Sequence, residues 1–408
     1  MSHGFSGAAI RGDFPALREV TFLNSASMGA VPAPALEAVA AQLRLLAAGP
    51  ARRGWADFIG EFEEPIEAAR AEARRLLGAS EDEVGLISDT TSGLHQAIDA
   101  IPFAAGDNVL VGDLEYPQVA LAVENAVRLD GVELRFVRHR GGRITIDDYR
   151  AAIDERTRAL FVSSVGWVTG QRLDLAALSD LAAKRGFFLV VDAVQHLGAV
   201  DLDCSKLGID FLMAGGYKWL NAPFGVGLFY VRRAAHDRGL RIRRLGLLGL
   251  ETPSGGWGRF YDRADMEPLP RQDPSHTVRR FEAQGTPNRV GAAGLAASLA
   301  YRNALDGRAP MTHVLDLSRE CMRALAARGA RIFTPEADAE RAGIVTFTLG
   351  GGPEQDRALR RFLEERGIVV SVRYCSGIGG VRVAVHFFNV AEDVARLLSA
   401  VDDFRRRS

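Results

Sequence analysis

Short apolar runs alternate with longer amphipathic segments through the first two thirds of the chain. Runs of roughly four to eight apolar residues bounded by Gly, Pro or Asp are typical of buried strands. The predicted strands cover residues 84–87, 108–112, 133–138, 159–164, 187–191 and 211–214, with another apolar run from residue 227. Apolar residues at helical spacing predict helices at 32–48 and 52–77, from Leu94 onward, and around Val119 and Asp147. The repeated order of strand and helix predicts an α/β fold, with a mostly parallel sheet flanked by helices on both faces.

The last third of the chain has a different order of elements. A helix of small residues at 289–303 is followed by helix, strand, strand, helix, strand, strand and helix, which predicts a smaller α+β domain. We expect an N-terminal segment at 1–30 that packs on this domain and on the active site. A large domain should cover 31–290, and the small domain with its linking helix 291–408. Residues 235–278 hold few periodic signals and are predicted to form a long excursion near the mouth of the site.

Composition excludes several classes of protein. The chain has 408 residues, of which 47% are hydrophobic and 25% charged, and its net charge is −1. Such a balance gives no reason to expect a nucleic acid or a membrane surface as partner. No apolar run approaches the roughly 18 residues of a membrane span, and the first residues do not resemble a secretion signal. Three cysteines suggest a reducing cytoplasm, and no spacing of metal ligands is visible.

Lysine is rare in this chain, and one lysine stands in an unusual setting. Of 50 basic residues, only those at 184, 206 and 218 are Lys. Arg keeps its proton in proteins, whereas a buried Lys can become a neutral amine that forms an imine with an aldehyde cofactor. Lys218 follows a buried run and lies among Gly and aromatic residues, where burial should lower its pKa. Lys184 and Lys206 are expected to be ordinary surface residues.

An acid and an amide are predicted to lie beside this lysine. Asp192 ends the apolar run at 187–191, and Gln195 follows three residues later. Ligands of open α/β sheets bind at the carboxyl ends of the strands, so both side chains should face the crevice that contains Lys218.

The stretch from residue 190 to 230 resembles the class V aminotransferase family of pyridoxal-phosphate enzymes. In that family, which includes cysteine desulfurases, isopenicillin N epimerase-like proteins and, more distantly, kynureninase, an acid-x-x-Gln strand end precedes the lysine, and a Gly-rich turn follows it. The resemblance implies fold type I, with a seven-stranded-type sheet. It also implies Lys218 as the Schiff-base lysine, Asp192 as partner of the pyridine nitrogen and Gln195 as donor to the ring phenolic oxygen.

A phosphate site is predicted at residues 88–93, which read Ser-Asp-Thr-Thr-Ser-Gly. Hydroxyls and backbone N–H groups at a helix N-terminus bind anions. The resemblance implies Thr90 and Thr91 as phosphate ligands. Asp89 stands where the family often has Gly, and an acid is compatible with the site only if it points away or caps the helix.

Three further residues are assigned to the cofactor by the resemblance. Tyr116 occupies the position of a residue that stacks on the cofactor ring, where desulfurases commonly carry His. Tyr217 is a candidate for a phosphate contact, as in kynureninase-like relatives. Thr286, in the segment Gly-Thr-Pro-Asn, corresponds to a Thr that reaches the phosphate of the neighbouring subunit, which implies a homodimer with shared active sites.

The resemblance also implies residues that bind an amino-acid substrate. Asn24 and Ala26 belong to a small-residue turn near the N-terminus that should line the substrate pocket. Trp167 follows the strand at 159–164 and is expected to be a pocket wall. Arg382 matches the family arginine that clamps the substrate carboxylate, a role that suits a bidentate guanidinium.

The family signature does not decide the reaction. We favour a lyase that acts on a cysteine-type C–S bond, while transamination, epimerisation and decarboxylation remain open, because all class V reactions share the same cofactor chemistry. Cys375 lies closer to the preceding Arg than the nucleophilic Cys of desulfurases does, which argues against a persulfide at this residue. A nucleotide-binding dehydrogenase and a non-catalytic relative are the alternatives from other classes.

Overall fold

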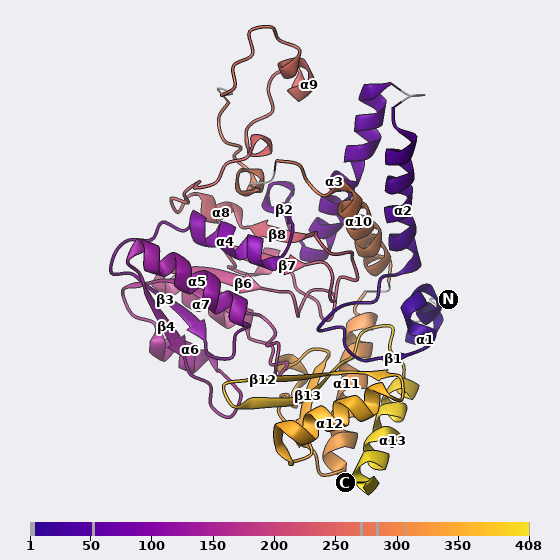
Figure 1. The fold of residues 1–408 in the computed structure, drawn as a ribbon. Coiled ribbons are helices and arrows are strands. Elements are labelled where there is room, and N and C mark those ends of the chain that lie inside the picture. The colour runs from indigo at the N-terminus through magenta and orange to yellow at the C-terminus, as the bar shows by residue number, and fades with distance from the viewer. Residues whose placement is uncertain (1–4, 51–53, 270–271, 283–284, 306, 408) are drawn as a thin grey trace.

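The structure, a computed structural model, describes residues 5–50, 54–269, 272–282, 285–305 and 307–407 (Figure 1). The helices are α1 (Gly7–Ile10), α2 (Ala33–Ala48), α3 (Trp55–Leu77), α4 (Thr90–Ala100), α5 (Pro117–Asp130), α6 (Ile146–Ala152), α7 (Leu175–Arg185), α8 (Arg233–His236), α9 (Gly256–Tyr261), α10 (Arg289–Asn303), α11 (Ala309–Ala327), α12 (Gly352–Glu364) and α13 (Ala391–Arg407). The strands are β1 (Thr21–Phe22), β2 (Val84–Ile87), β3 (Asn108–Gly112), β4 (Glu133–Val137), β5 (Thr157–Ser163), β6 (Phe188–Asp192), β7 (Phe211–Gly215), β8 (Gly227–Val231), β9 (Arg331–Ile332), β10 (Ile344–Thr348), β11 (Ile368–Val369), β12 (Ser371–Cys375) and β13 (Ile378–Ala384).

A seven-stranded sheet forms the centre of the larger part of the molecule. Its strand order is β2-β8-β7-β6-β5-β3-β4. β8 is antiparallel to both of its neighbours, and the other pairs are parallel. The prediction of a mostly parallel α/β sheet is therefore confirmed. The carboxyl ends of β5, β6 and β7 lie side by side at one edge, as a ligand site of an open sheet requires.

Alternating side chains of the strands pack on two separate faces of this sheet. In β6, Leu189 and Val191 belong to a core with apolar residues of α3, α6, α7 and α10. Phe188 and Val190 of the same strand point into a second core with α4 and α5. Because both faces are covered, the strands are apolar throughout, and this is why the sequence shows continuous runs.

The C-terminal part is built on a four-stranded antiparallel sheet of order β12-β13-β10-β9, which packs with α11, α12 and α13. The predicted order of helices and strands is correct with one addition. The sequence predicted two strands after α12, whereas the structure has β11, β12 and β13. β11 pairs in parallel with β1, with Thr21 opposite Ile368, so its hydrogen bonds go to the N-terminal segment.

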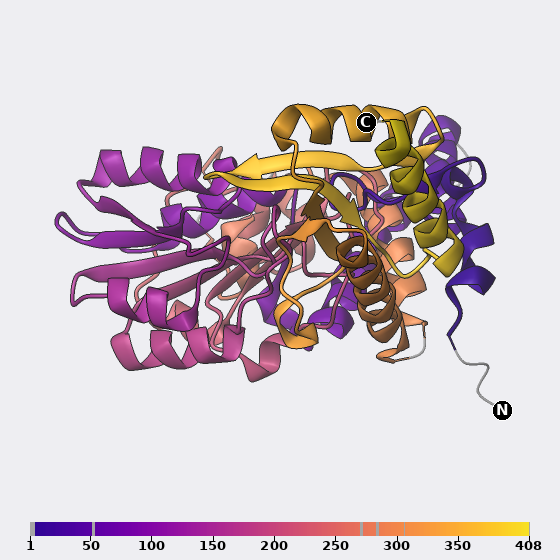
Figure 2. The ribbon, with the colours of Figure 1, turned by 90° about the horizontal axis from the view of Figure 1, so that it is seen from below.

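Hydrogen bonds join the C-terminal part to loops that follow strands of the seven-stranded sheet. Figure 2 shows the β12–β13 hairpin extending from the C-terminal helices across to the larger part, where Ser376 Oγ donates to Asp113 O at 2.7 Å. On the other side, Arg172 N donates to Glu340 O at 2.7 Å.

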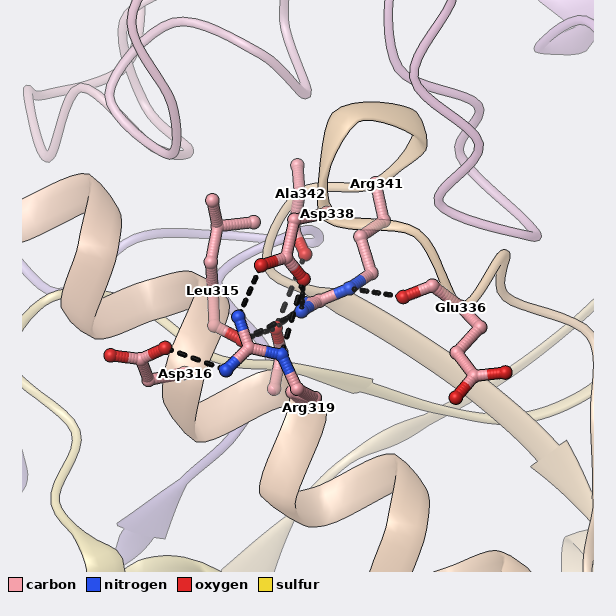
Figure 3. Close-up of polar contacts among 8 residues, drawn as sticks. Leu315, Asp316, Arg319, Glu336, Asp338, Arg341 and Ala342 are labelled. Carbon is pink, nitrogen blue, oxygen red and sulfur yellow. Dashed lines mark hydrogen bonds and ion pairs between the residues drawn. The ribbon is translucent and has the colours of Figure 1, made fainter.

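The loop that carries Glu340 is fixed by a polar cluster around Arg341 (Figure 3). The Arg341 side chain is fully buried, donates to Leu315 O at 2.9 Å and pairs with Asp338, which also binds Arg319. Since the cluster ties this loop to α11, it also fixes the carbonyl of Glu340 that accepts the Arg172 N–H.

Helix α10 packs against both α2 and α3 beside the sheet, and a long excursion rises above α8 and β2 at the top of Figure 1, with α9 near its tip. In the described residues of the predicted excursion, 235–269 and 272–278, the elements are the end of α8, the short helix α9 and brief 3₁₀ turns. None of the helices in the described ranges combines the length and the apolar character that a bilayer crossing requires.

The aromatic centre of the sheet makes a prediction for stability. Phe211 is fully buried, and its ring lies 6.3 to 6.4 Å from the rings of Phe188, Phe229 and Phe281. We expect Phe211→Ala to lower the free energy of unfolding by about 3–5 kcal/mol, because the substitution leaves a cavity. Leu269→Ala, at a side chain that is 77% exposed, is the matched control and should change it by less than about 0.5 kcal/mol. Urea denaturation measures both, and equal midpoints would contradict the packing described.

Candidate active site

Lys218 lies in a tight loop that follows β7. Gly216 N donates to Val226 O at 2.9 Å, and Asn221 N donates to Lys218 O at 3.2 Å, so the loop closes on both sides of the lysine. Asn221 adopts the left-handed conformation, with φ of 55°, which Asn tolerates better than most residues. Burial lowers the pKa of the Lys218 amine to about 8, although nearby Asp192 opposes the shift. A substantial fraction of the amine is therefore neutral near pH 8, as nucleophilic attack requires.

Asp192 is the last residue of β6 and is only 5% exposed. Its Oδ1 accepts the Val194 N–H at 2.9 Å. Burial raises the pKa of this carboxyl to about 6, and the positive charge of Lys218 lowers it in part. A buried carboxylate without a hydrogen-bonded cation is costly, so Asp192 is suited to accept a proton from a ligand.

One cavity of about 110 Å³ joins these two groups. The strands and loops at the carboxyl edge of the sheet bring most of the predicted residues to its wall: Thr90, Thr91, Tyr116, Trp167, Asp192, Gln195, Tyr217 and Lys218. Thr286 is exposed and does not line this cavity. Asn24, Ala26 and Arg382 do not line it either, and they are connected to it through hydrogen bonds.

The N-terminus of α4 forms one end of the cavity. Asp89 caps this helix and accepts the Ser92 N–H at 2.8 Å. Of the two arrangements that the sequence left open for Asp89, the helix cap is the one found. Thr90 Oγ1 accepts Gly215 N–H at 2.9 Å, which ties the helix start to the end of β7. Thr91 follows in the first turn, where free backbone N–H groups favour an anion.

Aromatic rings form the walls beside the amine. The Lys218 Nζ lies 5.7 Å from the ring centroid of Tyr116 and 5.5 Å from that of Tyr217. Tyr116 is 46% exposed and packs edge-on against Trp167, with ring centroids 5.3 Å apart. Tyr217 stacks on Phe224 at 4.8 Å. Tyr116 is thus accessible from the cavity and from outside, as a ring that covers a flat ligand must be.

The N-terminal turn packs directly on the lysine loop. Gly29 N donates to Tyr217 O at 2.8 Å, and a Cβ on Gly29 would lie 1.9 Å from Lys218 O, so only glycine fits there. Gln195 Nε2 donates to Ala26 O at 3.0 Å, and its Oε1 accepts from Trp219 Nε1 at 2.6 Å. These bonds fix the orientation of the Gln195 amide and use one of its two N–H donors.

Arg382 on β13 is almost fully buried, and among the described residues its hydrogen bonds go only to neutral acceptors. Its Nη1 bonds to Trp167 O at 2.7 Å, its Nη2 to Ser27 Oγ at 2.8 Å and its Nε to Ser371 Oγ at 3.1 Å. Burial, with a smaller contribution from Arg373, lowers the pKa of Arg382 to about 9. Asn24 contributes indirectly, because its Oδ1 accepts from Ser27 Oγ at 2.9 Å. A buried guanidinium with neutral partners is prepared for an anionic ligand.

The sequence alone did not single out several residues of the site. Ser163 lines the cavity and lies opposite Asp192 in the β5–β6 register. Its position at the end of a predicted strand was the available signal. Ser27 and Arg373, whose Nη2 donates to Ser27 Oγ at 3.3 Å, were not assigned either. Their association depends on a contact between the N-terminal turn and the C-terminal sheet, which no local pattern indicates.

Cys375 lies at the end of β12, and its thiol donates to Asp113 O at 3.5 Å. Burial raises the pKa of this thiol above its usual value. A protonated thiol is a poor nucleophile, in line with the expectation that Cys375 does not carry a persulfide. In the described part of the chain, no group of three or more His, Cys, Asp or Glu side chains is placed to hold a metal ion.

Comparison with known proteins places this site in a family. The model of the family described as aminotransferase class-V matches residues 21–397. The chain belongs to the class V aminotransferase family. It is 29% identical to an isopenicillin N epimerase of Amycolatopsis lactamdurans, over 95% of this chain and 96% of that protein. It is also 29% identical to a cysteine desulfurase of Klebsiella pneumoniae, over 98% and 99%. The fold is similar to the apo structure of a cysteine desulfurase from Thermococcus onnurineus, with a TM-score of 0.83, 22% identity and 98% coverage of both chains.

The class V assignment confirms the prediction of a pyridoxal-phosphate-dependent enzyme of fold type I that acts on an amino acid. The residues of the cavity fit this cofactor. Among the hydrogen bonds of the described residues none involves the Lys218 amine or joins the Asp192 carboxylate to a cation, and the α4 N-terminus offers an anion site on the wall of the same cavity. Amine, acid and anion site correspond to the aldehyde, the ring nitrogen and the phosphate.

The lowered pKa of Lys218 makes a prediction for cofactor capture. Only the neutral amine attacks an aldehyde, so the rate at which apoprotein binds pyridoxal phosphate should rise with pH, with a midpoint near 8 instead of 10.5. At pH 8 about half of the amine is then neutral, against about 0.3% for an ordinary lysine. The rate of cofactor binding is measured from pH 6 to 10 as the increase in the violet absorbance of the imine. Lys218→Arg is the control and should form no imine band. A midpoint above 10 would contradict the burial of the amine.

Proposed function

We propose that this class V enzyme is a lyase that acts on the Cβ–S bond of a cysteine-type amino acid, with Lys218 as its Schiff-base lysine. One observation carries the proposal: the Lys218 amine and the Asp192 carboxylate face one cavity, and burial lowers the pKa of the amine to about 8. The relatives named cysteine desulfurase, at 27–29% identity along nearly the whole chain, support the choice of a sulfur substrate.

Each polar group around the cavity has a role in this proposal. Asp192 would accept a hydrogen bond from the ring nitrogen, and the remaining N–H of Gln195 would reach the ring oxygen. Thr90, Thr91 and Tyr217 would hold the phosphate at the start of α4. Tyr116 would cover one face of the ring and exclude water. When bound, the cofactor supplies an electron sink for the carbon atoms of the amino acid.

Lys218 Nζ is the proton carrier in this arrangement. As the neutral amine, Nζ would remove the proton from Cα of the substrate, as its lowered pKa allows at neutral to mildly alkaline pH. Arg382 holds the substrate carboxylate, while Trp167 and the turn with Asn24 and Ala26 bound the space beside it. Fixing the carboxylate orients the Cα–H bond towards Nζ, which is the condition for proton transfer.

Epimerisation is the second candidate reaction. The raised pKa of Cys375 disfavours a mechanism that needs a thiolate, and epimerisation requires neither a thiol nor a leaving group. The relatives named isopenicillin N epimerase, 29% identical over 94% or more of this chain, support it equally well. Both reactions begin with removal of the Cα proton, and they diverge only after that step.

The assembly is also a proposal. The chain is proposed to act in the cytoplasm as a homodimer, in which Thr286 reaches the phosphate of the neighbouring subunit. Exposure of Thr286 in the single chain supports this role, since a residue that serves another subunit must be accessible. We further propose that residues 31–290 and 291–408 are the large and small domains, and that the N-terminal segment 1–30 packs on the small domain and on the active site.

A panel of amino acids distinguishes the two reactions. We expect cysteine-type substrates to yield pyruvate, ammonia and a sulfur product, measured by coupled assay. Lys218→Ala should lose the visible absorbance and all turnover, whereas Cys375→Ala should keep the wild-type rate, because its thiol is protonated. Deuterium incorporation at Cα from heavy water, without formation of pyruvate, would contradict the lyase reaction and support epimerisation instead. Wild-type protein that gains no visible absorbance when incubated with pyridoxal phosphate would contradict both proposed reactions.

Loss of the Arg382 guanidinium should affect substrate binding more than folding. Arg382→Gln is expected to lower kcat/KM roughly 10- to 100-fold, mainly through KM, because a charged hydrogen bond to the carboxylate is lost. Arg396→Gln, at an exposed position on α13, is the control and should leave kcat/KM unchanged. An unchanged KM in Arg382→Gln would show that another residue binds the substrate carboxylate.

A further inference from the structure

A second carboxylate lies close to Asp192 and has no assigned role. Glu115 belongs to the short segment 113–116 that follows β3, next to Tyr116. Two neighbours hold the backbone of this segment: Trp167 Nε1 donates to Leu114 O at 3.1 Å, and Ser376 Oγ donates to Asp113 O. The position of the Glu115 side chain is therefore set by the wall of the cavity and by the β12–β13 hairpin together.

Glu115 is connected to Asp192 through one serine. The Glu115 carboxylate accepts the Ser163 N–H at 2.7 Å, and it also accepts the Ser163 hydroxyl in a close contact. Ser163 lines the cavity and lies directly opposite Asp192 on the neighbouring strand. Asp192 lies on the cavity wall where the ring nitrogen of the cofactor is expected, and Glu115, which does not line the cavity, is bonded to the neighbouring Ser163.

The charges around Glu115 are mostly negative or neutral. Burial raises the pKa of this carboxyl to about 7, the two bonds from Ser163 lower it in part, and Asp192 raises it further. The groups that face it from other elements are Tyr149 of α6 and the Cys375 thiol of β12, whose own pKa values are raised in part by Glu115. Asp113 lies on its own segment. Within the described residues, no cation is among the groups that shift its pKa, and Asp192 is the one acid of the cavity wall among them.

We propose that Glu115 is a positioning residue that acts through Ser163 and Asp192 to set how firmly the ring nitrogen of the bound cofactor keeps its proton. The proposal rests on the proposed function. When Glu115 is ionised, its charge makes Asp192 a stronger base, and the N–H of the ring is held more tightly. When Glu115 is protonated, Asp192 acts alone. The pair therefore couples the electron-accepting strength of the cofactor to pH around neutrality, where Glu115 changes its charge.

The direct test measures the ring nitrogen itself. Holoenzyme is prepared with ¹⁵N-labelled pyridoxal phosphate, and the chemical shift of the ring nitrogen is followed by NMR from pH 5 to 9. We expect the wild type to show a step near pH 7 and to keep its ring proton up to a higher pH than Glu115→Gln. The loss of one charge should lower the pKa of the ring nitrogen by about one unit or more. Glu124→Gln, at an exposed position on α5, is the matched charge control and should titrate like the wild type.

A second variant keeps the test decisive if Glu115→Gln folds poorly. Ser163→Ala retains the Glu115 charge and removes the hydroxyl bond that lowers the pKa of Glu115, so the step near pH 7 should move to higher pH. Thermal melting of each holoenzyme identifies any variant that is only destabilised. An unchanged ring-nitrogen titration in both variants, with the cofactor bound through Lys218, overturns the role of Glu115 and leaves the proposed function intact. Wild-type protein that does not bind the cofactor contradicts the proposed function instead.

Discussion

The structure depends on the opposition of one buried amine and one buried carboxylate across a small cavity. Each group is shifted towards its neutral form by loss of water, and each is partly restored by the charge of the other. Such a pair is unfavourable in an empty pocket and favourable once a ligand supplies an aldehyde and a basic ring nitrogen. The parallel strands make the arrangement possible, because Asp192 ends β6 and Lys218 follows the end of adjacent β7.

Much of this arrangement could be predicted from the sequence, because it depends on residues that are close together along the chain. Continuous apolar runs mark strands that are covered on both faces, and such runs located Asp192 and Lys218 at one edge of a sheet. The rarity of lysine singled out Lys218 among 50 basic residues. The helix cap at Asp89 was one of two arrangements expected from local sequence, and it is the one found.

The remainder of the site depends on long-range contacts, which no local pattern contains. Arg382 was assigned by resemblance, but its bonds to Ser27 and to the carbonyl of Trp167 require three distant segments to meet. The Glu115–Ser163 contact joins the segment after β3 to the end of the neighbouring β5, in a register that the sequence does not specify. The extra strand β11 was missed for a similar reason, since two residues with a partner near the N-terminus leave no periodic signal.

The N-terminal turn is built into the site by its pairing with the end of the chain. β1 pairs with β11, Asn24 bridges to Ala384, and Gly29 lies against the backbone of Lys218. These partners lie far along the chain from the turn, so the turn can pair only after the lysine loop, β11 and β13 have all formed. The pocket is therefore completed by contacts of long range, and a chain that has formed only its central sheet still lacks the turn that packs on the backbone of Lys218.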